Sequence, residues 1–196
     1  LLIGMEYIFK QSGPMTMGAS QVCGFIKSDP SRATPNLQFH VQPISTDILG
    51  ATKMHDFDGI TPTIANVRPT SRGEINIASS DARVNPKIKM NYLSTQDDRD
   101  VAAKALKIVR KIMLNTETFK KYEPEEYRPG ANINDNEELV KAASEHSQTI
   151  FHPVGTCKMG SGDDAVVDSK LCARGLQNLR IVDASIMPNI TSGNTN

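Results

Sequence analysis

Apolar and polar residues alternate along several short runs in the first third of the chain. In residues 37–44 (LQFHVQPI), three apolar side chains share one face of an expected strand: Leu37, Phe39 and Val41. Three polar side chains share the other face: Gln38, His40 and Gln42. Three further runs have a strand-like texture: residues 20–28, 60–69 and 73–79. Because side chains alternate across a strand, the pattern predicts an antiparallel sheet with one face in a core.

Beyond Tyr92 the hydrophobic period becomes helical. Five apolar residues recur at helical spacing over residues 96–114: Val101, Ala105, Ile108, Val109 and Ile112. Thr95 is the expected N-cap of this helix, and Asp135 that of a second helix, with Glu138 at capping-box spacing. Strands followed by helices predict an α+β domain over residues 1–150, in which the first helix packs on the apolar face of the sheet.

Two glycine- and proline-rich parts of the chain carry further predictions. Gly73 connects two of the strand-like runs and predicts a tight turn with positive φ. From Phe151 onward glycine and proline increase, and residues 178–185 (NLRIVDAS) predict a last strand. Residues 151–196 therefore form a second segment, distinct from the domain of residues 1–150.

The composition excludes several classes of partner. Lys plus Arg and Asp plus Glu number 22 each, so the net charge is zero, and neither nucleic acid nor an anionic membrane is attracted by bulk charge. The apolar runs are all shorter than the roughly 20 residues that span a bilayer. Three separated cysteines favour neither a disulfide framework nor a zinc site: Cys23, Cys157 and Cys172. They are expected to pack as small apolar residues in a cytoplasmic protein.

Four histidines are candidates for chemistry. His55 in a loop and His146 near a helix end are expected to be solvated or capping residues. His40 lies on the polar face of its strand, where it is either a partly exposed sheet residue or a cavity-facing one. His152 differs, because Pro153 restricts the backbone on one side and a predicted helix precedes it. A rigidly held imidazole suits a general base, although a His-Pro pair alone does not specify one.

The segment from His152 to the end of the chain closely resembles the C-terminal signature of the glucose–methanol–choline (GMC) oxidoreductases. The resemblance lies in the residues HPVGTCKMG…VVDSKLCARGLQNLRIVDASIMPNITSGNTN. Upstream, residues 68–100 and 28–40 extend the resemblance in the correct order. Members of this family are flavoproteins that oxidise alcohols with FAD. The chain is most similar to the branch that contains choline dehydrogenases and bacterial alcohol dehydrogenases.

The resemblance implies a role for particular residues. His152 matches the active-site histidine beside flavin N5, and Asn194 matches a second active-site position that is histidine or asparagine among members. Asp183 matches a cofactor-proximal position. Four more residues are implied to lie near the cofactor: Ala184, Ile186, Met187 and Thr195. The early sheet resembles the substrate-binding domain, which implies a place for His40 near the substrate pocket.

The implied reaction is oxidation of a choline-like or other primary alcohol. A neutral His152 would take the hydroxyl proton while hydride passes to flavin N5, and the Asn194 amide would donate to the developing alkoxide. No GxGxxG fingerprint occurs, so the domain that binds most of the FAD is expected to precede Leu1. The chain is then the C-terminal part of a longer protein, inactive and weak in FAD binding alone, with an apolar interface that could also support self-association.

Two other functions remain open on the sequence. The chain could be a stand-alone ligand-binding or interaction module that kept the fold without the cofactor, and flavin colour would discriminate between the two. A hydrolase built on histidine is disfavoured because no GxSxG nucleophile elbow is present. For location, the cytoplasm is expected, with peripheral attachment to the inner membrane as the alternative.

Overall fold

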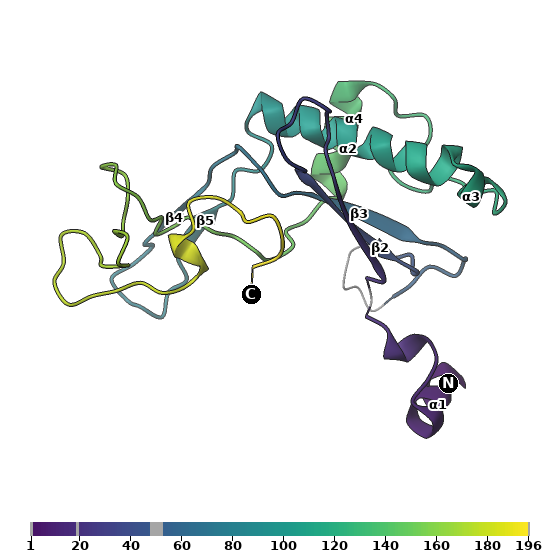
Figure 1. Cartoon of the computed structure of the whole chain (residues 1–196), viewed down its shortest axis with the longest axis horizontal. Helices are drawn as coiled ribbons and strands as arrows, with labels where there is room; N and C mark the ends of the chain where they lie inside the picture. Colours follow the sequence, from purple (N-terminus) through teal and green to yellow (C-terminus); the bar gives the residue numbers. More distant parts are fainter. Residues whose placement is uncertain (1, 19, 48–52, 196) are drawn as a thin grey trace.

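The computed structural model describes all residues except 1, 19, 48–52 and 196 (Figure 1). Its centre is an antiparallel sheet in the order β1-β2-β3, formed by β1 (Val22–Ile26), β2 (Leu37–Gln42) and β3 (Thr61–Asn66). The register places Phe39 of the central strand between Gly24 and Ile64. The predicted antiparallel sheet is therefore confirmed, with strands slightly shorter than the sequence runs.

Helix α2 (Gln96–Asn115) covers one face of this sheet, as Figure 1 shows. Four buried side chains form the core between them: Leu37, Phe39, Val101 and Ala105. Each large apolar side chain buried here stabilises the fold by about 1.5–3 kcal/mol. Helix α4 (Asn136–His146) packs on α2 through Leu139 and Ala142, and the short α3 (Glu117–Lys120) follows α2. The predicted helix on the apolar face is confirmed.

Side-chain caps begin both predicted helices. The Thr95 hydroxyl accepts from the backbone N–H of Asp98 at 3.3 Å. The Asp135 carboxylate accepts from the N–H groups of Glu137 and Glu138 at 2.8 and 3.2 Å. Both N-cap predictions are confirmed, and each cap satisfies backbone donors that the first helical turn leaves unpaired.

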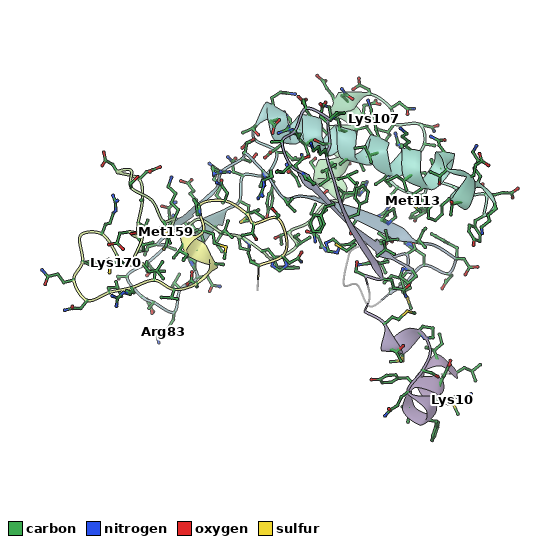
Figure 2. The ribbon with its side chains drawn as sticks, in the orientation of Figure 1. Lys10, Arg83, Lys107, Met113, Met159 and Lys170 are labelled. Atoms are coloured by element: carbon green, nitrogen blue, oxygen red, sulfur yellow. The ribbon has the colours of Figure 1, made fainter. Side chains whose placement is uncertain are left out.

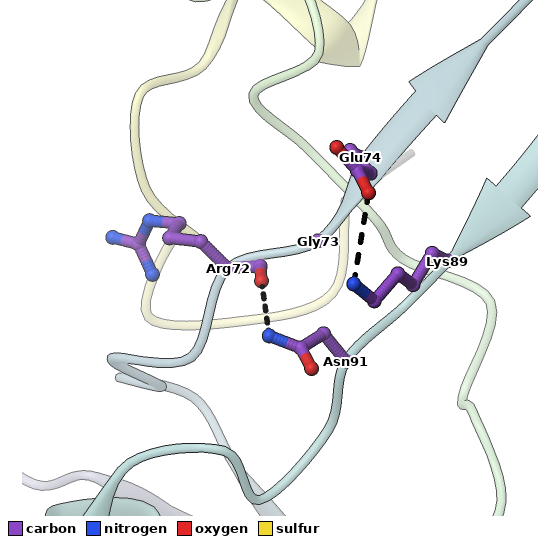
Figure 3. A pocket seen from close by; sticks show the side chains of 5 residues that line it. All are labelled: Arg72, Gly73, Glu74, Lys89 and Asn91. Atoms are coloured by element: carbon purple, nitrogen blue, oxygen red, sulfur yellow. Dashed lines mark hydrogen bonds and ion pairs between the residues drawn. The ribbon is translucent and has the colours of Figure 1, made fainter.

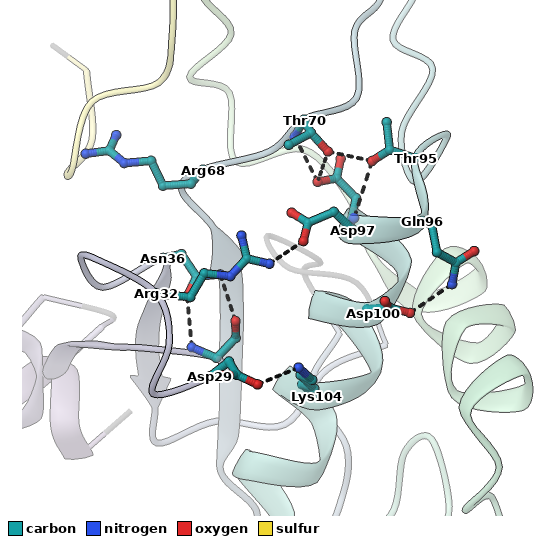
Figure 4. Close-up of polar contacts among 12 residues, drawn as sticks. Asp29, Arg32, Asn36, Arg68, Thr70, Thr95, Gln96, Asp97, Asp100 and Lys104 are labelled. Atoms are coloured by element: carbon teal, nitrogen blue, oxygen red, sulfur yellow. Dashed lines mark hydrogen bonds and ion pairs between the residues drawn. The ribbon is translucent and has the colours of Figure 1, made fainter.

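The loop between β1 and β2 is tied to α2 by charged side chains (Figure 4). Asp29 accepts from Lys104 at 2.8 Å, and Arg32 forms an ion pair with Asp97. Within the loop, the buried Asn36 side chain accepts from the Ser28 N–H at 2.8 Å. These contacts fix the entry into the central strand β2.

The N-terminal helix, a second hairpin and much of residues 151–196 lie away from the sheet, whereas Asn194 returns to it. Helix α1 (Leu2–Lys10) was not predicted from the sequence; it has no buried residue and continues into the 3-10 helix η1 (Pro14–Thr16). At the opposite end of the molecule lie the hairpin of β4 (Glu74–Asn76) and β5 (Lys87–Lys89) and the C-terminal segment (Figure 2). No helix in the described part of the chain is long and apolar enough to cross a membrane.

Gly73, at the start of β4, does not have the positive φ that the sequence predicted. Glycine is required there for a different reason. A Cβ atom at this position would lie 2.3 Å from the carbonyl oxygen of Lys89 and 2.7 Å from that of Met90. The two strands of the hairpin therefore approach too closely for any other residue.

We expect Gly73→Ala to destabilise the β4–β5 hairpin, because the backbone atoms that meet the new methyl group cannot move aside as a flexible side chain would. The expected loss is about 1–3 kcal/mol in the free energy of unfolding. Urea denaturation of the two proteins measures it. Gly24→Ala is the matched control, since a Cβ there meets no atom of the described part of the chain within 4 Å. Equal effects of the two substitutions would contradict the close-approach argument.

Two further sequence predictions are wrong. Residues 178–185 do not form a strand: Arg180 makes a single bridge with Cys172, and residues 184–186 form the 3-10 helix η2 (Ala184–Ile186). Apolar side chains of the run 178–185 are also exposed to solvent: Leu179 is 47% exposed and Val182 is 72% exposed. Residues 171 and 173 supply backbone partners to Leu179 and Ile181 only, so the pairing ends after one bridge. The three cysteines are free, but Cys23 is exposed rather than packed.

Candidate functional site

His152 makes a hydrogen bond with each of its ring nitrogens. Its Nε2 lies 2.9 Å from the Asn194 Nδ2, and its Nδ1 lies 3.1 Å from the Thr195 Oγ1. An amide nitrogen can only donate, so Nε2 must accept with its lone pair. Nδ1 then carries the proton and donates to the Thr195 hydroxyl. The ring is thus a neutral imidazole with its basic nitrogen directed at Asn194.

The backbone around His152 is held by its neighbours on both sides. Phe151 has a positive φ of 63°, and Pro153 fixes the following φ. Gly155 also has a positive φ, of 92°, and a Cβ on it would lie 3.4 Å from the Met187 carbonyl oxygen. This close passage brings the segment after His152 against residues 185–187.

Backbone hydrogen bonds join these two segments. The N–H of Cys157 donates to the Ser185 carbonyl at 3.0 Å, and the N–H of Met159 donates to the Ile186 carbonyl at 2.8 Å. Residues 183–187 therefore lie beside the His152 loop, and they include Asp183, Ala184, Ile186 and Met187, which the resemblance implies to lie near a cofactor. All but Asp183 of these five residues are half-buried in this arrangement.

Asp183 caps the helix η2 from an exposed position. Its carboxylate accepts from the N–H of Ser185 at 2.8 Å. Hydrogen bonds from the Ser185 side chain and backbone hold the pKa of this carboxyl below its usual range. Asp183 is therefore ionised at neutral pH, and it fixes the turn that carries residues 184–187 past the His152 loop.

Asn194 is attached to the central sheet by Gln38. The Gln38 Nε2 donates to the Asn194 Oδ1 at 2.9 Å and lies 3.5 Å from the Cys23 Sγ. Gln38 is only 4% exposed, although it lies on the polar face of β2. That face therefore borders the candidate site, and His40, half-buried, occupies the next position along it.

Two arginines hold the backbone that leads to Asn194. Arg68 donates through Nη2 to the Ser192 hydroxyl at 2.6 Å and through Nη1 to the Ile190 carbonyl. Arg72 donates to the Asn189 side chain at 2.9 Å. Sequence reasoning missed both arginines, because their partners lie more than 100 residues further along the chain. Gln38 carried a signal, since it shares a strand face with His40.

The arginines project from a loop, residues 67–72, that the buried carboxylate of Asp98 holds. Asp98 accepts from the N–H groups of Thr70 and Ser71, each at 2.9 Å (the surrounding contacts are drawn in Figure 4). Burial alone would raise the pKa of Asp98. The hydrogen bonds from Ser71 and Thr70 outweigh burial and lower the pKa below its ordinary value.

We expect Asp98→Asn to destabilise the fold by about 1–3 kcal/mol at pH 7, because an NH2 group would then face backbone donors. A lowered carboxyl pKa stabilises the fold above the unfolded value of about 3.9. That stabilisation is lost as pH falls through the folded pKa, so the difference between the two proteins should close in acid. Denaturant titrations at several pH values measure this. Asp100→Asn, on the exposed face of α2, is the control and should show neither effect.

A shallow polar hollow lies at the base of the β4–β5 hairpin (Figure 3). It has a volume of about 220 Å³ and is lined by Arg72, Gly73, Glu74, Lys89 and Asn91. Glu74 and Lys89 form an ion pair of 3.7 Å within it, and Asn91 donates to the Arg72 carbonyl at 2.9 Å. Of the five lining residues, only Arg72 is linked to the His152 site, through its hydrogen bond with Asn189.

His55 is not the solvated residue that the sequence predicted. Its Nδ1 lies 2.9 Å from the Ser45 hydroxyl and its Nε2 lies 3.0 Å from the Asp47 carboxylate. The ring stacks on Phe57 and meets Tyr127 edge-on. His146 does lie exposed in the last turn of α4, as predicted. In the described part of the chain, no group of three or more His, Cys, Asp or Glu residues is arranged to hold a metal.

Solved structures share the helix-covered sheet of this chain, and a family profile matches the segment that contains its histidine loop. The crystal structure of pyridoxine 4-oxidase from Mesorbium loti superposes with a TM-score of 0.79 and 28% identity, over 90% of this chain and 35% of that chain. The GMC oxidoreductase family profile matches residues 69–196, which is more than half of the chain. The chain therefore belongs to the GMC oxidoreductase family.

Curated relatives match over essentially the whole chain. The alcohol dehydrogenase (acceptor) of Pseudomonas putida is 41% identical over 100% of this chain. The oxygen-dependent choline dehydrogenase of Proteus mirabilis is 39% identical over 99% of it. In both cases the match covers 35% of the relative, so the chain spans about a third of the length of these proteins and corresponds to a C-terminal part.

Proposed function

We propose that this chain supplies the substrate-facing sheet and the catalytic base of an FAD-dependent oxidoreductase that oxidises a primary alcohol of the choline type. One observation carries the proposal: the basic nitrogen of a neutral His152 meets the amide donor of Asn194 at 2.9 Å. An alcohol oxygen that replaces this hydrogen bond would find in Nε2 an acceptor for its proton and in the amide a donor for its developing charge.

The division of the chain follows from this proposal. Residues 1–150 are the substrate-binding domain, with His40 near the pocket on the polar face of β2. Residues 151–196 carry the active-site groups and return towards the FAD-binding domain, which is the proposed partner. Exposed apolar side chains such as Ile77, 89% exposed, and Phe151, 75% exposed, support such a partner or self-association. Three free cysteines support a reducing, cytoplasmic location.

The residues present fit a bound FAD, the cofactor that membership of the family implies. Segments 183–187 and 194–195 reach the His152 loop from two sides, one through backbone hydrogen bonds and the other through the histidine ring. Residues proposed to contact the cofactor are Asp183, Ala184, Ile186, Met187, Asn194 and Thr195. When bound, FAD accepts the hydride from the α-carbon of the alcohol.

This chain's own residues provide the remaining chemistry. The alcohol O–H bond breaks as its proton passes to His152 Nε2, which forms the imidazolium. Asn194 Nδ2 donates to the oxygen as negative charge develops on it, and the amide stays uncharged throughout. Thr195 accepts from Nδ1–H and holds the ring in place. Loss of hydride from the α-carbon then completes the carbonyl of the aldehyde product.

Anaerobic mixing of the whole flavoprotein with alcohols tests the proposal. Choline or another primary alcohol should bleach the flavin absorbance, whereas a tertiary alcohol of similar size should not, because it has no α-hydrogen to transfer. Absence of bleaching with every primary alcohol tried would overturn the proposal. The 196-residue chain alone should bind FAD weakly or not at all. Stoichiometric flavin on it would show that the cofactor site is complete within these residues.

A stand-alone binding module is the second candidate function. It would keep the His152–Asn194 contact as a structural feature and would have no cofactor. A colourless whole protein that binds an alcohol without oxidising it would favour this alternative. The presence of both the HPVGT and SGNTN motifs favours the enzyme, because a binding module needs neither an oriented base nor an oxyanion donor.

A further inference from the structure

Gln38 connects the core of the sheet to the reacting end of the site. It lies on the central strand β2, paired with Phe25 on one side and Ala65 on the other, so its backbone is fixed from both sides. Its side chain is buried, and its Nε2 faces two acceptors, the Asn194 Oδ1 and the Cys23 Sγ. Rotating the amide by half a turn would place its oxygen against both of them.

The oxygen of the Gln38 amide, Oε1, supports this orientation of the side chain. This oxygen is buried and has no hydrogen-bond partner among the residues that the structure describes. A buried unpaired oxygen is uncommon in folded proteins and is tolerated where the group serves another purpose. The feature that glutamine contributes here is therefore its donor, which faces Asn194.

The orientation of Gln38 determines the orientation of Asn194. Because Gln38 donates, Asn194 must turn its Oδ1 towards the strand, and its Nδ2 is then the group that faces His152. An inverted Asn194 would place its NH2 against the Gln38 NH2 and its oxygen against His152 Nε2. That oxygen would favour a proton on Nε2, the wrong tautomer for a base at this nitrogen.

We propose that Gln38 is a positioning residue that selects the tautomer of His152 through the Asn194 amide. The sequence of contacts is directional: Gln38 donates to Asn194, Asn194 donates to His152 Nε2, and His152 Nδ1–H donates to Thr195. The selection of the His152 tautomer depends only on contacts within the folded chain. The effect of this tautomer on catalysis rests on the function proposed above.

Nitrogen NMR of the 196-residue chain labelled with 15N-histidine tests the selection directly. The spectra are recorded at about pH 8.5, two units above the ordinary histidine pKa of about 6.5, because each tautomer of a neutral imidazole has a distinct 15N signature. With four histidines, the His152 signals are identified by their loss in His152→Ala. We expect a proton on Nδ1 and none on Nε2 in the unmodified chain. A proton on Nε2 there overturns the proposal without any further variant.

Gln38→Met removes the donor at similar volume, and Gln42→Met is the matched control. Gln42 lies on the same face of β2, is also buried at 8% exposure, and has the same side chain. We expect Gln38→Met to lose the single tautomer, so that both forms are populated, and Gln42→Met to retain Nδ1–H. A single Nδ1–H tautomer in a natively folded Gln38→Met chain overturns the proposal.

The whole flavoenzyme separates this inference from the proposed function. There, Gln38→Met should slow flavin reduction by alcohol by up to about 10²-fold, the cost of a misoriented reacting group. Mixed tautomers with an unchanged reduction rate would support Gln38 as the positioning residue and overturn His152 as the base. A slower rate with an unchanged single tautomer would overturn the positioning role.

Discussion

Replacing His152 with alanine in the whole flavoenzyme lowers the rate of flavin reduction by alcohol by about 10²–10⁴-fold, the usual cost of losing a positioned general base. The expectation rests on the contacts of its two nitrogens, which leave Nε2 as a lone-pair acceptor 2.9 Å from Asn194. Asn194→Ala should cost about 10²–10³-fold, as expected for one donor aimed at developing charge. FAD should remain bound in both variants.

Anaerobic stopped-flow reduction of each purified variant measures these rates. His146→Ala is the control, because that histidine is exposed at the end of α4 and should leave the rate unchanged. A near-parental rate for His152→Ala would mean that the histidine only holds the loop in place. A loss of bound flavin would instead assign it to the cofactor site.

Replacing Arg110 with alanine destabilises the fold by about 3–5 kcal/mol, because it strands a buried carboxylate. Arg110 and Glu126 form a bidentate ion pair with N···O distances of 2.7 and 2.8 Å, and their side chains are 15% and 9% exposed. The guanidinium also donates to the backbone carbonyls of Ile133 and Gly130. Arg110 of α2 thus holds the loop that leads to α4 at three positions: Glu126, Gly130 and Ile133.

Chemical denaturation of the variants measures this loss. The control is Lys120→Ala, which breaks the ion pair between Lys120 and Glu117. The Lys120 side chain is 53% exposed and the Glu117 side chain is 89% exposed. An exposed pair contributes about 0–1 kcal/mol, so the two substitutions should differ clearly. The double variant Arg110→Met, Glu126→Leu should be less destabilised than Arg110→Ala, since no charge is left buried. A loss of less than 1 kcal/mol in Arg110→Ala would contradict the argument.

Local patterns were sufficient to predict the central architecture. The hydrophobic period of strand β2 and that of helix α2 each match the geometry of the element. The N-cap of α2 and its apolar face could be predicted from single residues such as Thr95 and Val101. The alternation in β2 also placed Gln38 and His40 together on one face. Their side of the candidate site was therefore within reach of sequence reasoning.

What the sequence could not predict depends on contacts between distant segments. The run at 178–185 has the composition of a strand, but its backbone pairs with residues 171–173 at a single bridge, so it remains irregular. Arg68 and Asp98 occupy unremarkable positions in the sequence, and only the fold brings them to the support of residues 189–192. Gly73 was correctly singled out for the wrong reason, because close approach of a second strand has no local signal.

The two faces of strand β2 separate the requirements of folding from those of chemistry. Residues Leu37 and Phe39 belong to the core under α2, whereas Gln38 contacts Asn194 from the opposite face, which His40 shares. Substrate preference can therefore diversify on the polar face while Gln38 and the core residues stay constant. A directed-evolution library limited to positions 40 and 42 would sample new specificities on an intact scaffold. A one-residue insertion in the same strand would exchange the two faces and abolish both properties at once.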